Sequence, residues 1–336
     1  MTRDHLLYAA AAVAVVLALL APFITAPSQG ESLPRIYIIY DYGKGDLSYT
    51  DSAYRGLFAA QEALPFLKRE FVSPDPATVA SFRKITGPER PGLVITVGEN
   101  FSETTRHLAG ENPDVLFLAI DQAGIGSDNI RAYEITSYGG SYLAGVLAAS
   151  ATRTKKVGII LGIRSELLDA FHAGYRDGVL AADPSVTVMV AYVNETSTQG
   201  FTDPGRAAEI AGSMYRDGTD IIYTAAGFSG TGAINEAKRA PGRYVIGVDT
   251  DQTHLGPTVV LASAVKRVDR AVYSGIGTYL NGTFSGGNTV AGLSEGMTML
   301  SYNPKFAAYA QKVSSHEEEA RAGELRYLAS RKNRGQ

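Results

Sequence analysis

Short hydrophobic runs alternate with amphipathic helical patterns along most of the chain. The runs are rich in Val, Ile and Tyr, and Gly, Pro or Asp flanks them, which is typical of buried strands. Ten strands are predicted, at residues 35–41, 69–74, 92–98, 115–121, 129–135, 156–162, 187–193, 220–226, 244–249 and 258–263. Helices are predicted between them, at residues 52–68, 99–113, 141–152, 167–182, 204–218 and 230–242. Strands that alternate with such helices indicate an α/β fold whose parallel sheets are covered on both faces.

The number of strands and a glycine-rich break divide this pattern into two parts. Ten strands exceed one small doubly wound sheet, and the stretch ITSYGGSYLAG at residues 135–145 separates the first five from the last five. A chain of 336 residues also suits two packed units, at roughly 150 residues per domain. We therefore expect two Rossmann-like lobes with a cleft between them. Ligands of such sheets bind beyond the carboxyl ends of the strands.

The N-terminus carries a long uncharged segment. Residues 6–26 contain no charge, and 21 residues are enough to span the hydrocarbon core of a membrane as a helix. Arg3 precedes the segment, which favours a cytoplasmic start. A cleaved signal peptide has a shorter apolar core, Pro27 follows the nearest cleavage site, and Pro22 would interrupt a buried core helix. We expect residues 1–33 to form an uncleaved transmembrane anchor with its linker, and the remainder to lie outside the cytoplasm.

Composition excludes several classes of site. The formal charge of -3 comes from 31 basic and 34 acidic residues spread through the chain, so no nucleic-acid partner is expected. The chain has no cysteine, which excludes disulfides and thiolate zinc sites. Its five histidines show no spacing typical of metal ligands, and no metal site is predicted.

Polar residues follow several of the predicted strands directly. Asp41, Asp121 and Asp249 each end or follow a hydrophobic run, and Gly98 follows another. An aspartate in this position often caps the next helix by accepting hydrogen bonds from free N–H groups. Three carboxylates at the same edge of the sheets also suit a ligand rich in hydroxyl groups, such as a ribose, because an ionised carboxylate accepts hydrogen bonds from a diol.

The sequence AAGFSGTGA at residues 225–233 raises a further possibility at the cleft. Glycines between a strand and a helix allow backbone amides to approach a phosphate. The lysine of a phosphate-binding loop is absent here, and the G-x-G-x-x-G pattern is not met. Gly227 and Phe228 therefore fit a close approach to a neutral ligand or a tight turn equally well.

Several motifs occur in the order typical of one protein family. They are the loop YDYGKGDLSYTDSAYRG, followed by VITVG, PDVLFLAID, AAGFSGTG, IGVDTDQ and ASAVKRVDRAVY. From about residue 35 to residue 303 the chain resembles the basic membrane protein family, which comprises nucleoside-binding receptors of ABC importers. The resemblance implies the type I periplasmic binding protein fold, in which two lobes joined by a three-stranded hinge close on a ligand.

The resemblance also implies the division of the chain into lobes. The first lobe would comprise residues 34–137 and 262–284, and the second lobe residues 138–261 and 285–303. Residues 304–336 form a highly charged, helix-prone tail, which is interpreted as a solvated terminal helix or as a helix that binds a partner.

Carried over to this sequence, the family pattern assigns roles to the first-lobe residues. Asp41 and Asp121 would bind the base or hold the loop that does, and Tyr49 would stack on one face of a purine. Family members usually have Phe followed by Asn where this chain has Tyr49 and Thr50. Stacking survives that change, but Thr50 lacks the paired donor and acceptor of an amide. The base preference is therefore open at Thr50.

The second lobe would supply the remaining contacts. Tyr223 matches the second stacking aromatic by position, and Phe228 is an alternative. Asp249 would accept hydrogen bonds from the ribose, and Lys266 would supply a cation to the cleft. An inward-facing strand residue for Tyr223 and a solvated helix residue for Lys266 are the plainer interpretations.

These features predict capture of a ligand without catalysis. The expected ligand is a nucleoside, with a purine favoured, the expected partners are an ABC permease and its ATPase, and a monomer without cofactor is expected. A membrane-anchored sensor is the first alternative, and a nucleoside hydrolase with calcium at DTDQ is the second. Of three N-x-[ST] sites, at Asn100, Asn194 and Asn281, Asn100 is expected to stay unmodified because it follows a strand at the cleft.

Overall fold

The computed structural model describes residues 32–72 and 90–334. The described residues from Pro34 onward form one compact unit. Within the described residues, no helix is both long and apolar enough to span a membrane. The predicted anchor at residues 6–26 lies outside the described part of the chain.

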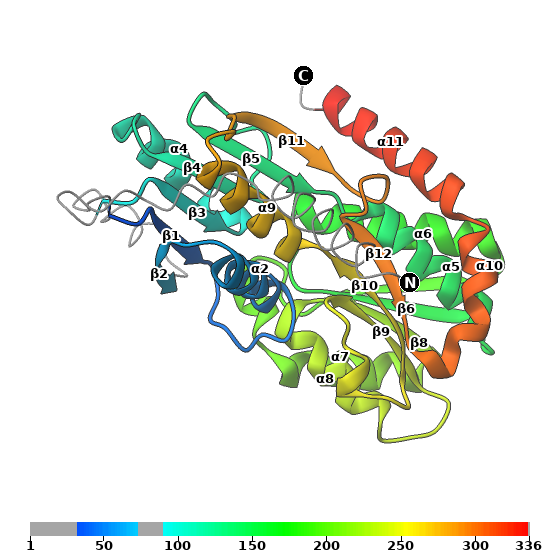
Figure 1. Ribbon diagram of the computed structural model, residues 1–336. Helices are drawn as coiled ribbons and strands as arrows, with labels where there is room; N and C mark the ends of the chain where they lie inside the picture. The colour runs from blue at the N-terminus through cyan, green and yellow to red at the C-terminus, as the bar shows by residue number, and fades with distance from the viewer. Residues whose placement is uncertain (1–31, 73–89, 335–336) are drawn as a thin grey trace, which may run out of the picture. The chain divides into compact units, whose positions relative to one another are not determined.

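The first lobe is built on a parallel sheet with the strand order β11-β5-β4-β3-β1-β2 (Figure 1). Its strands are β1 (Arg35–Tyr40), β2 (Leu67–Val72), β3 (Leu93–Val97), β4 (Leu116–Ile120), β5 (Ile130–Ile135) and β11 (Gly287–Ala291). Its helices are α2 (Tyr49–Ala63), α4 (Ser102–Glu111) and α9 (Val268–Leu280). Alternate residues of β1 face opposite sides, so Ile38 packs in the core with α2 and α9 while Ile39 packs in the core on the α4 side.

The second lobe repeats this arrangement with the strand order β12-β10-β9-β8-β6-β7. Its strands are β6 (Lys156–Leu161), β7 (Thr187–Tyr192), β8 (Ile221–Ala225), β9 (Tyr244–Asp249), β10 (Val260–Lys266) and β12 (Thr298–Tyr302). Its helices are α5 (Tyr138–Ala151), α6 (Glu166–Ala182), α7 (Pro204–Arg216) and α8 (Gly230–Ala237). Helices α5 and α6 share one hydrophobic core, and α7 and α8 share the other. The prediction of two parallel-sheet lobes is confirmed, with β12 as an antiparallel edge strand.

The chain passes between the two lobes three times. The crossings are β5 to α5, β10 to α9, and β11 to β12. Two expected lobe boundaries are wrong: residues 262–266 belong to β10 in the second sheet, and β11 pairs with β5 in the first. The chain completes β10 and β11 before it crosses, which the hydrophobic pattern does not show. The five-residue strands β11 and β12 were not predicted, because both are short and partly exposed.

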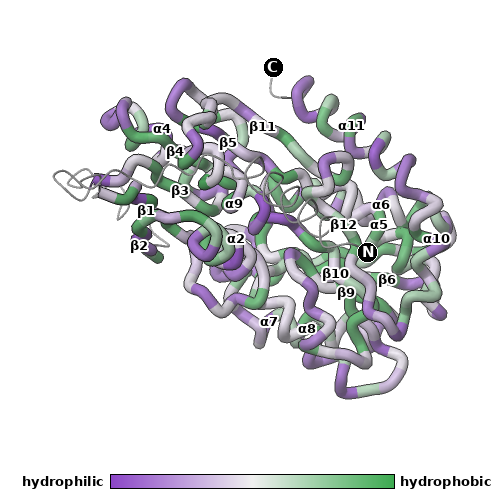
Figure 2. The backbone as a smooth tube through the Cα atoms, viewed as in Figure 1, coloured by the Kyte–Doolittle hydropathy of each residue, from purple (hydrophilic) through white to green (hydrophobic). Residues whose placement is uncertain are grey.

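The C-terminal tail continues as η6 (Pro304–Tyr309), α10 (Ala310–Ser314) and α11 (Glu317–Arg334). Figure 2 shows hydrophilic residues along much of α11, in contrast to the mainly hydrophobic strands of both sheets. Despite this composition, Ala320 and Glu324 are buried where α11 packs on α5. The tail helix is therefore docked on the second lobe rather than solvated all round.

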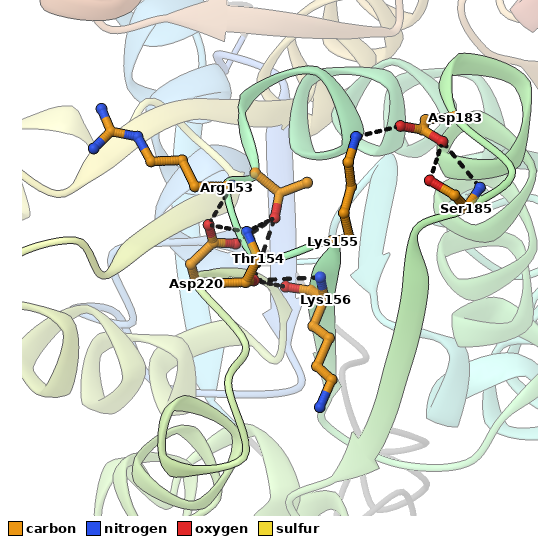
Figure 3. A network of polar contacts seen from close by, with 8 residues as sticks. Arg153, Thr154, Lys155, Lys156, Asp183, Ser185 and Asp220 are labelled. Carbon is orange, nitrogen blue, oxygen red and sulfur yellow. Dashed lines mark hydrogen bonds and ion pairs between the residues drawn. The ribbon is translucent and has the colours of Figure 1, made fainter.

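A polar network fixes the amino-terminal end of β6, at the opposite edge of the second sheet from the carboxyl strand ends (Figure 3). The Asp220 carboxylate accepts hydrogen bonds from Thr152 Oγ1 at 2.6 Å and from the Arg153 backbone N–H at 2.6 Å. Lys155, in the left-handed region with φ of 61°, forms an ion pair with Asp183 at 2.5 Å. These contacts join the loop between α5 and β6 to the residue before β8 and to the residue after α6.

Candidate functional site

A cavity of about 270 Å³ lies at the carboxyl ends of strands from both lobes. Side chains of both charge signs and several aromatic rings surround it. The lining residues are Asp41, Tyr42, Gly43, Lys44, Gly45, Asp46, Tyr49, Gly98, Glu99, Asn100, Leu167, Leu168, Phe171, Phe201, Thr202, Ala225, Gly227, Phe228, Val248, Asp249 and Lys266. Seven of the predicted site residues line the cavity: Asp41, Tyr49, Gly98, Gly227, Phe228, Asp249 and Lys266.

The loop after β1 is folded by its own carboxylates. Asp46 accepts hydrogen bonds from the backbone N–H groups of Ser48 at 3.0 Å and Thr50 at 2.8 Å. Asp51 accepts from the N–H of Leu47 at 2.9 Å. This local bonding starts α2 with the Tyr49 ring against the cavity. Thr50 is buried and does not line the cavity, so the structure contradicts its prediction as a ligand contact.

Asp41 directly follows β1 and is held by Asn100, which lies in the short helix η2 (Glu99–Phe101) after β3. Asn100 Nδ2 donates a hydrogen bond to Asp41 Oδ2 at 2.9 Å. Burial raises the pKa of Asp41 to about 7, the Asn100 hydrogen bond opposes that rise, and the charge of Glu99 adds to it. A carboxyl group that titrates near neutrality and faces a cavity is a candidate for ligand recognition.

Gly98 makes room for this carboxylate. Its φ is +124°, and a Cβ there would lie 2.8 Å from Asp41 Cβ and 2.9 Å from Asp41 Oδ2. Gly98 was predicted as a ligand contact from its strand-end position, and its close neighbour in the structure is the Asp41 side chain.

Replacing Gly98 by alanine is expected to displace Asp41 and to strain the backbone. We expect the free energy of unfolding to fall by about 2 kcal/mol and ligand affinity to fall at least tenfold. The matched control is Gly43→Ala on the same cavity wall, where a Cβ would meet no atom within 4 Å. Thermal denaturation and calorimetric titration measure both quantities, and equal behaviour of the two variants would contradict the role of Gly98.

Asp249 ends β9 and reaches across the cleft to the first lobe. Ser48 Oγ donates to Asp249 Oδ2 at 2.6 Å. Burial raises the pKa of Asp249 to about 6, while the Ser48 hydrogen bond and the charge of Lys266 oppose that rise. Asp249 and Asp121 occupy corresponding strand ends in the two lobes and share the left-handed backbone, with φ of 60° and 58°.

Lys266 and Asp121 form a buried ion pair between the lobes. Lys266 Nζ lies 2.5 Å from Asp121 Oδ2, and their side chains are 2% and 0% exposed. The other Asp121 oxygen accepts a hydrogen bond from the Ile135 N–H at 3.0 Å. Lys266 Nζ lies 5.6 Å from the Tyr49 ring centre and 5.7 Å from that of Phe171. Asp121 does not line the cavity, and its carboxylate holds Lys266, which does. Of the two roles predicted for Asp121, contact with the base or support of a neighbouring contact, this geometry favours the second.

The structure contradicts the predicted stacking role of Tyr223. The Tyr223 side chain is 0% exposed, packs 5.3 Å from the Tyr175 ring and shares a hydrogen bond with Ser141 Oγ at 3.1 Å. The Tyr223 ring packs in the hydrophobic core that α5 and α6 share.

Phe171 and Phe201 line the cavity together with Phe228, and sequence reasoning missed both. Phe201 lies in η3 (Thr198–Phe201), the short helix that follows β7. The strand-end rule, extended by one loop length, would have found Phe201. Phe171 lies inside α6. Its place in the helical repeat is that of an ordinary core residue, so the sequence pattern did not mark it as a ligand contact.

Further contacts bridge the two lobes at the mouth of the cavity. Tyr42 OH donates to the Thr198 carbonyl oxygen at 3.2 Å, and its ring lies 5.9 Å from Phe201 edge to face. Thr250 Oγ1 donates to the Leu47 carbonyl oxygen at 3.1 Å. With the bond from Ser48 to Asp249, these contacts hold the lobes together around the cavity. Among the described residues, no cluster of acidic or histidine side chains is arranged to hold a metal ion.

Comparisons with known proteins agree with this arrangement. The family described as "ABC transporter substrate-binding protein PnrA-like" matches residues 34–323. The chain belongs to this family. It is 32% identical to basic membrane protein A1 of Borrelia garinii subsp. bavariensis over 300 residues, which are 85% of this chain and 86% of the relative. It is also 32% identical to basic membrane protein A of Borreliella burgdorferi, with 84% and 83% of the two chains covered.

Solved structures extend the likeness to the fold. A solute-binding protein of an ABC transporter system from Aeropyrum pernix is 26% identical, with a TM-score of 0.73 and coverage of 88% of this chain and 90% of that chain. A glucose-galactose binding protein from Geobacillus stearothermophilus shares the fold, with 17% identity, a TM-score of 0.60 and coverage of 81% and 98%. The chain is thus a substrate-binding protein of the ABC transporter class with the type I periplasmic binding protein fold, and not an enzyme.

Proposed function

We propose that this protein captures a purine nucleoside in the cavity between its lobes and presents it to an ABC permease outside the cytoplasm. The observation that carries the proposal is the pairing of cleft carboxylates with aromatic rings in one enclosed site. Tyr49 comes from the first lobe, and Phe171, Phe201 and Phe228 come from the second. Closure of the lobes would therefore place a flat base between rings of opposite lobes.

The polar groups of the cavity suit the remaining parts of a nucleoside. Asp249, when ionised, accepts hydrogen bonds from the ribose hydroxyl groups. Asp41 and Asn100 together offer acceptor and donor atoms to the polar edge of a base. The ion pair of Lys266 with Asp121 places a fixed cation beside the rings.

The charges of the cavity favour a nucleoside over a nucleotide. Its wall carries four carboxylates, those of Asp41, Asp46, Glu99 and Asp249, and two ammonium groups, those of Lys44 and Lys266. Lys266 is already paired with Asp121, so a phosphate group would meet an excess of negative charge. The volume of about 270 Å³ is at the small end for ligand sites, which also favours a compact ligand.

The test is to identify and titrate the ligand of the full-length chain. Mass spectrometry of small molecules released from freshly purified protein is expected to find a purine nucleoside at about equimolar occupancy. Calorimetric titration of the emptied protein with inosine, adenosine, uridine and free ribose is expected to show saturable binding of the purine nucleosides only. A released sugar or amino acid would overturn the proposal, and release of ribose from bound inosine would show a hydrolase instead.

A further inference from the structure

The C-terminal helix α11 contacts two of the three chain crossings between the lobes. The buried side chain of Glu324 accepts a hydrogen bond from the Gly139 N–H at 2.9 Å and another from the Leu293 N–H at 3.0 Å. Gly139 lies just beyond the crossing from β5 to α5, and Leu293 lies in the crossing from β11 to β12. One carboxylate of the tail therefore joins two hinge segments that are far apart in the sequence.

Glycines allow this close approach. A Cβ on Gly292 would lie 2.4 Å from Glu324 Oε2, and a Cβ on Gly139 would lie 3.0 Å from Glu324 Oε1. On the helix side, a Cβ on Gly323 would lie 3.0 Å from atoms of the Tyr138 ring. The ring of Tyr138 stacks on that of Tyr327, one turn further along α11, with centres 5.1 Å apart. The hinge backbone and α11 thus fit together without space for larger residues.

Two turns further along the same face of α11, Arg331 bridges the two lobes themselves. Its guanidinium forms an ion pair with Glu134 of β5 in the first lobe. Its Nε also donates to Glu166 Oε1, at the start of α6 in the second lobe, at 2.9 Å. Arg331 and Glu134 are mostly buried, so solvent screens their interaction less than it screens an exposed pair. In Figure 1, α11 runs beside α5 and α6.

We propose that α11 is a strap that fixes the hinge in the closed arrangement and so sets the affinity of the cleft for its ligand. Glu324 holds the crossings, and Arg331 holds the lobes on either side of them. Both residues lie beyond residues 34–323, the part of the chain that the family model matches. If the hinge is already held closed, less of the free energy of ligand binding is used to close the lobes, and the ligand binds more tightly.

The strap can be tested in the full-length chain without any ligand. The chain has no cysteine, so spin labels can be attached at Ala59→Cys on α2 and Ser213→Cys on α7, both exposed positions in opposite lobes. Electron–electron resonance is expected to show a longer main distance between the labels in Glu324→Ala and in Arg331→Ala than in the parent chain. Glu324→Gln is a milder variant that loses one of the two acceptor oxygens, and an intermediate distance is expected.

Lys332→Ala is the matched control, because it removes a positive charge from an exposed position next to Arg331. It is expected to leave the distance unchanged. In a second measurement, which rests on the proposed function, inosine is expected to bind the two strap variants about tenfold more weakly than the parent. Unchanged distances in Glu324→Ala and Arg331→Ala would overturn the strap. Longer distances in a chain that binds no nucleoside would uphold the strap and overturn the proposed ligand.

Discussion

Replacing Lys266 by methionine is expected to lower the free energy of unfolding by about 3 to 5 kcal/mol. The variant would leave the Asp121 carboxylate, whose side chain is 0% exposed, without its partner at 2.5 Å. A buried charge without a counter-charge costs far more than the loss of a surface ion pair. Chemical denaturation followed by circular dichroism measures the effect.

The double variant Lys266→Met with Asp121→Asn is the control for that experiment. It removes both charges, keeps an oxygen to accept the hydrogen bond from Ile135, and places Asn at a left-handed position that Asn tolerates well. We expect it to recover most of the lost stability. A single variant within about 1 kcal/mol of the parent would contradict the expected cost of leaving the buried Asp121 without its partner.

Nucleoside binding is expected to weaken as the pH falls below about 7. The pKa of Asp41 is about 7 and that of Asp249 about 6, both raised chiefly by burial. Protonation of either carboxyl group removes an acceptor from the ligand. Affinity should therefore fall up to about tenfold per pH unit below 7, and more steeply below 6, where both groups protonate.

The stability of the ligand-free protein should depend on pH in the opposite direction. With both pKa values above those of an unfolded chain, near 4, the native state binds more protons than the unfolded state between pH 4 and pH 7. The contribution of these two groups to stability is thus present at low pH and is lost as the pH rises toward 7. Titration calorimetry and thermal denaturation across pH 5 to 8 separate the two effects.

Single substitutions show which carboxyl group causes which change in affinity with pH. Asp41→Asn is expected to remove the change in affinity near pH 7 and to leave the change near pH 6. Asp249→Asn is expected to do the reverse. Affinity that is constant from pH 5.5 to 8 in a folded protein would show that neither carboxylate accepts a hydrogen bond from the ligand.

The hydrophobic pattern predicted the architecture well because it reports local properties. Each of the ten predicted strands is present, and buried runs flanked by glycine and aspartate needed no tertiary information. The edge strands β11 and β12 escaped prediction because they are short and partly exposed, so neighbouring strands stabilise them more than their own residues do.

The lining of the cavity was predicted only in part. Residues whose position follows from the local pattern were predicted correctly, and residues whose position depends on tertiary packing were not. Asp41, Gly98 and Asp249 were found because the carboxyl end of a parallel strand faces the ligand side of its sheet. Tyr223 was misplaced because the family pattern indicates a position along a strand, while the face that a side chain takes depends on the pleat and on the helices above it.

The sequence by itself determined two α/β lobes, the family and the strand-end carboxylates, since these depend on periodicity and on residues close together in the chain. Only the tertiary structure decided that Phe171 and Phe201 line the cavity and that Lys266 pairs with Asp121. It also decided that Glu324 of the charged tail accepts hydrogen bonds from two hinge segments. Each of these contacts joins segments far apart in sequence, and they form only when the two lobes and the final helix have packed together.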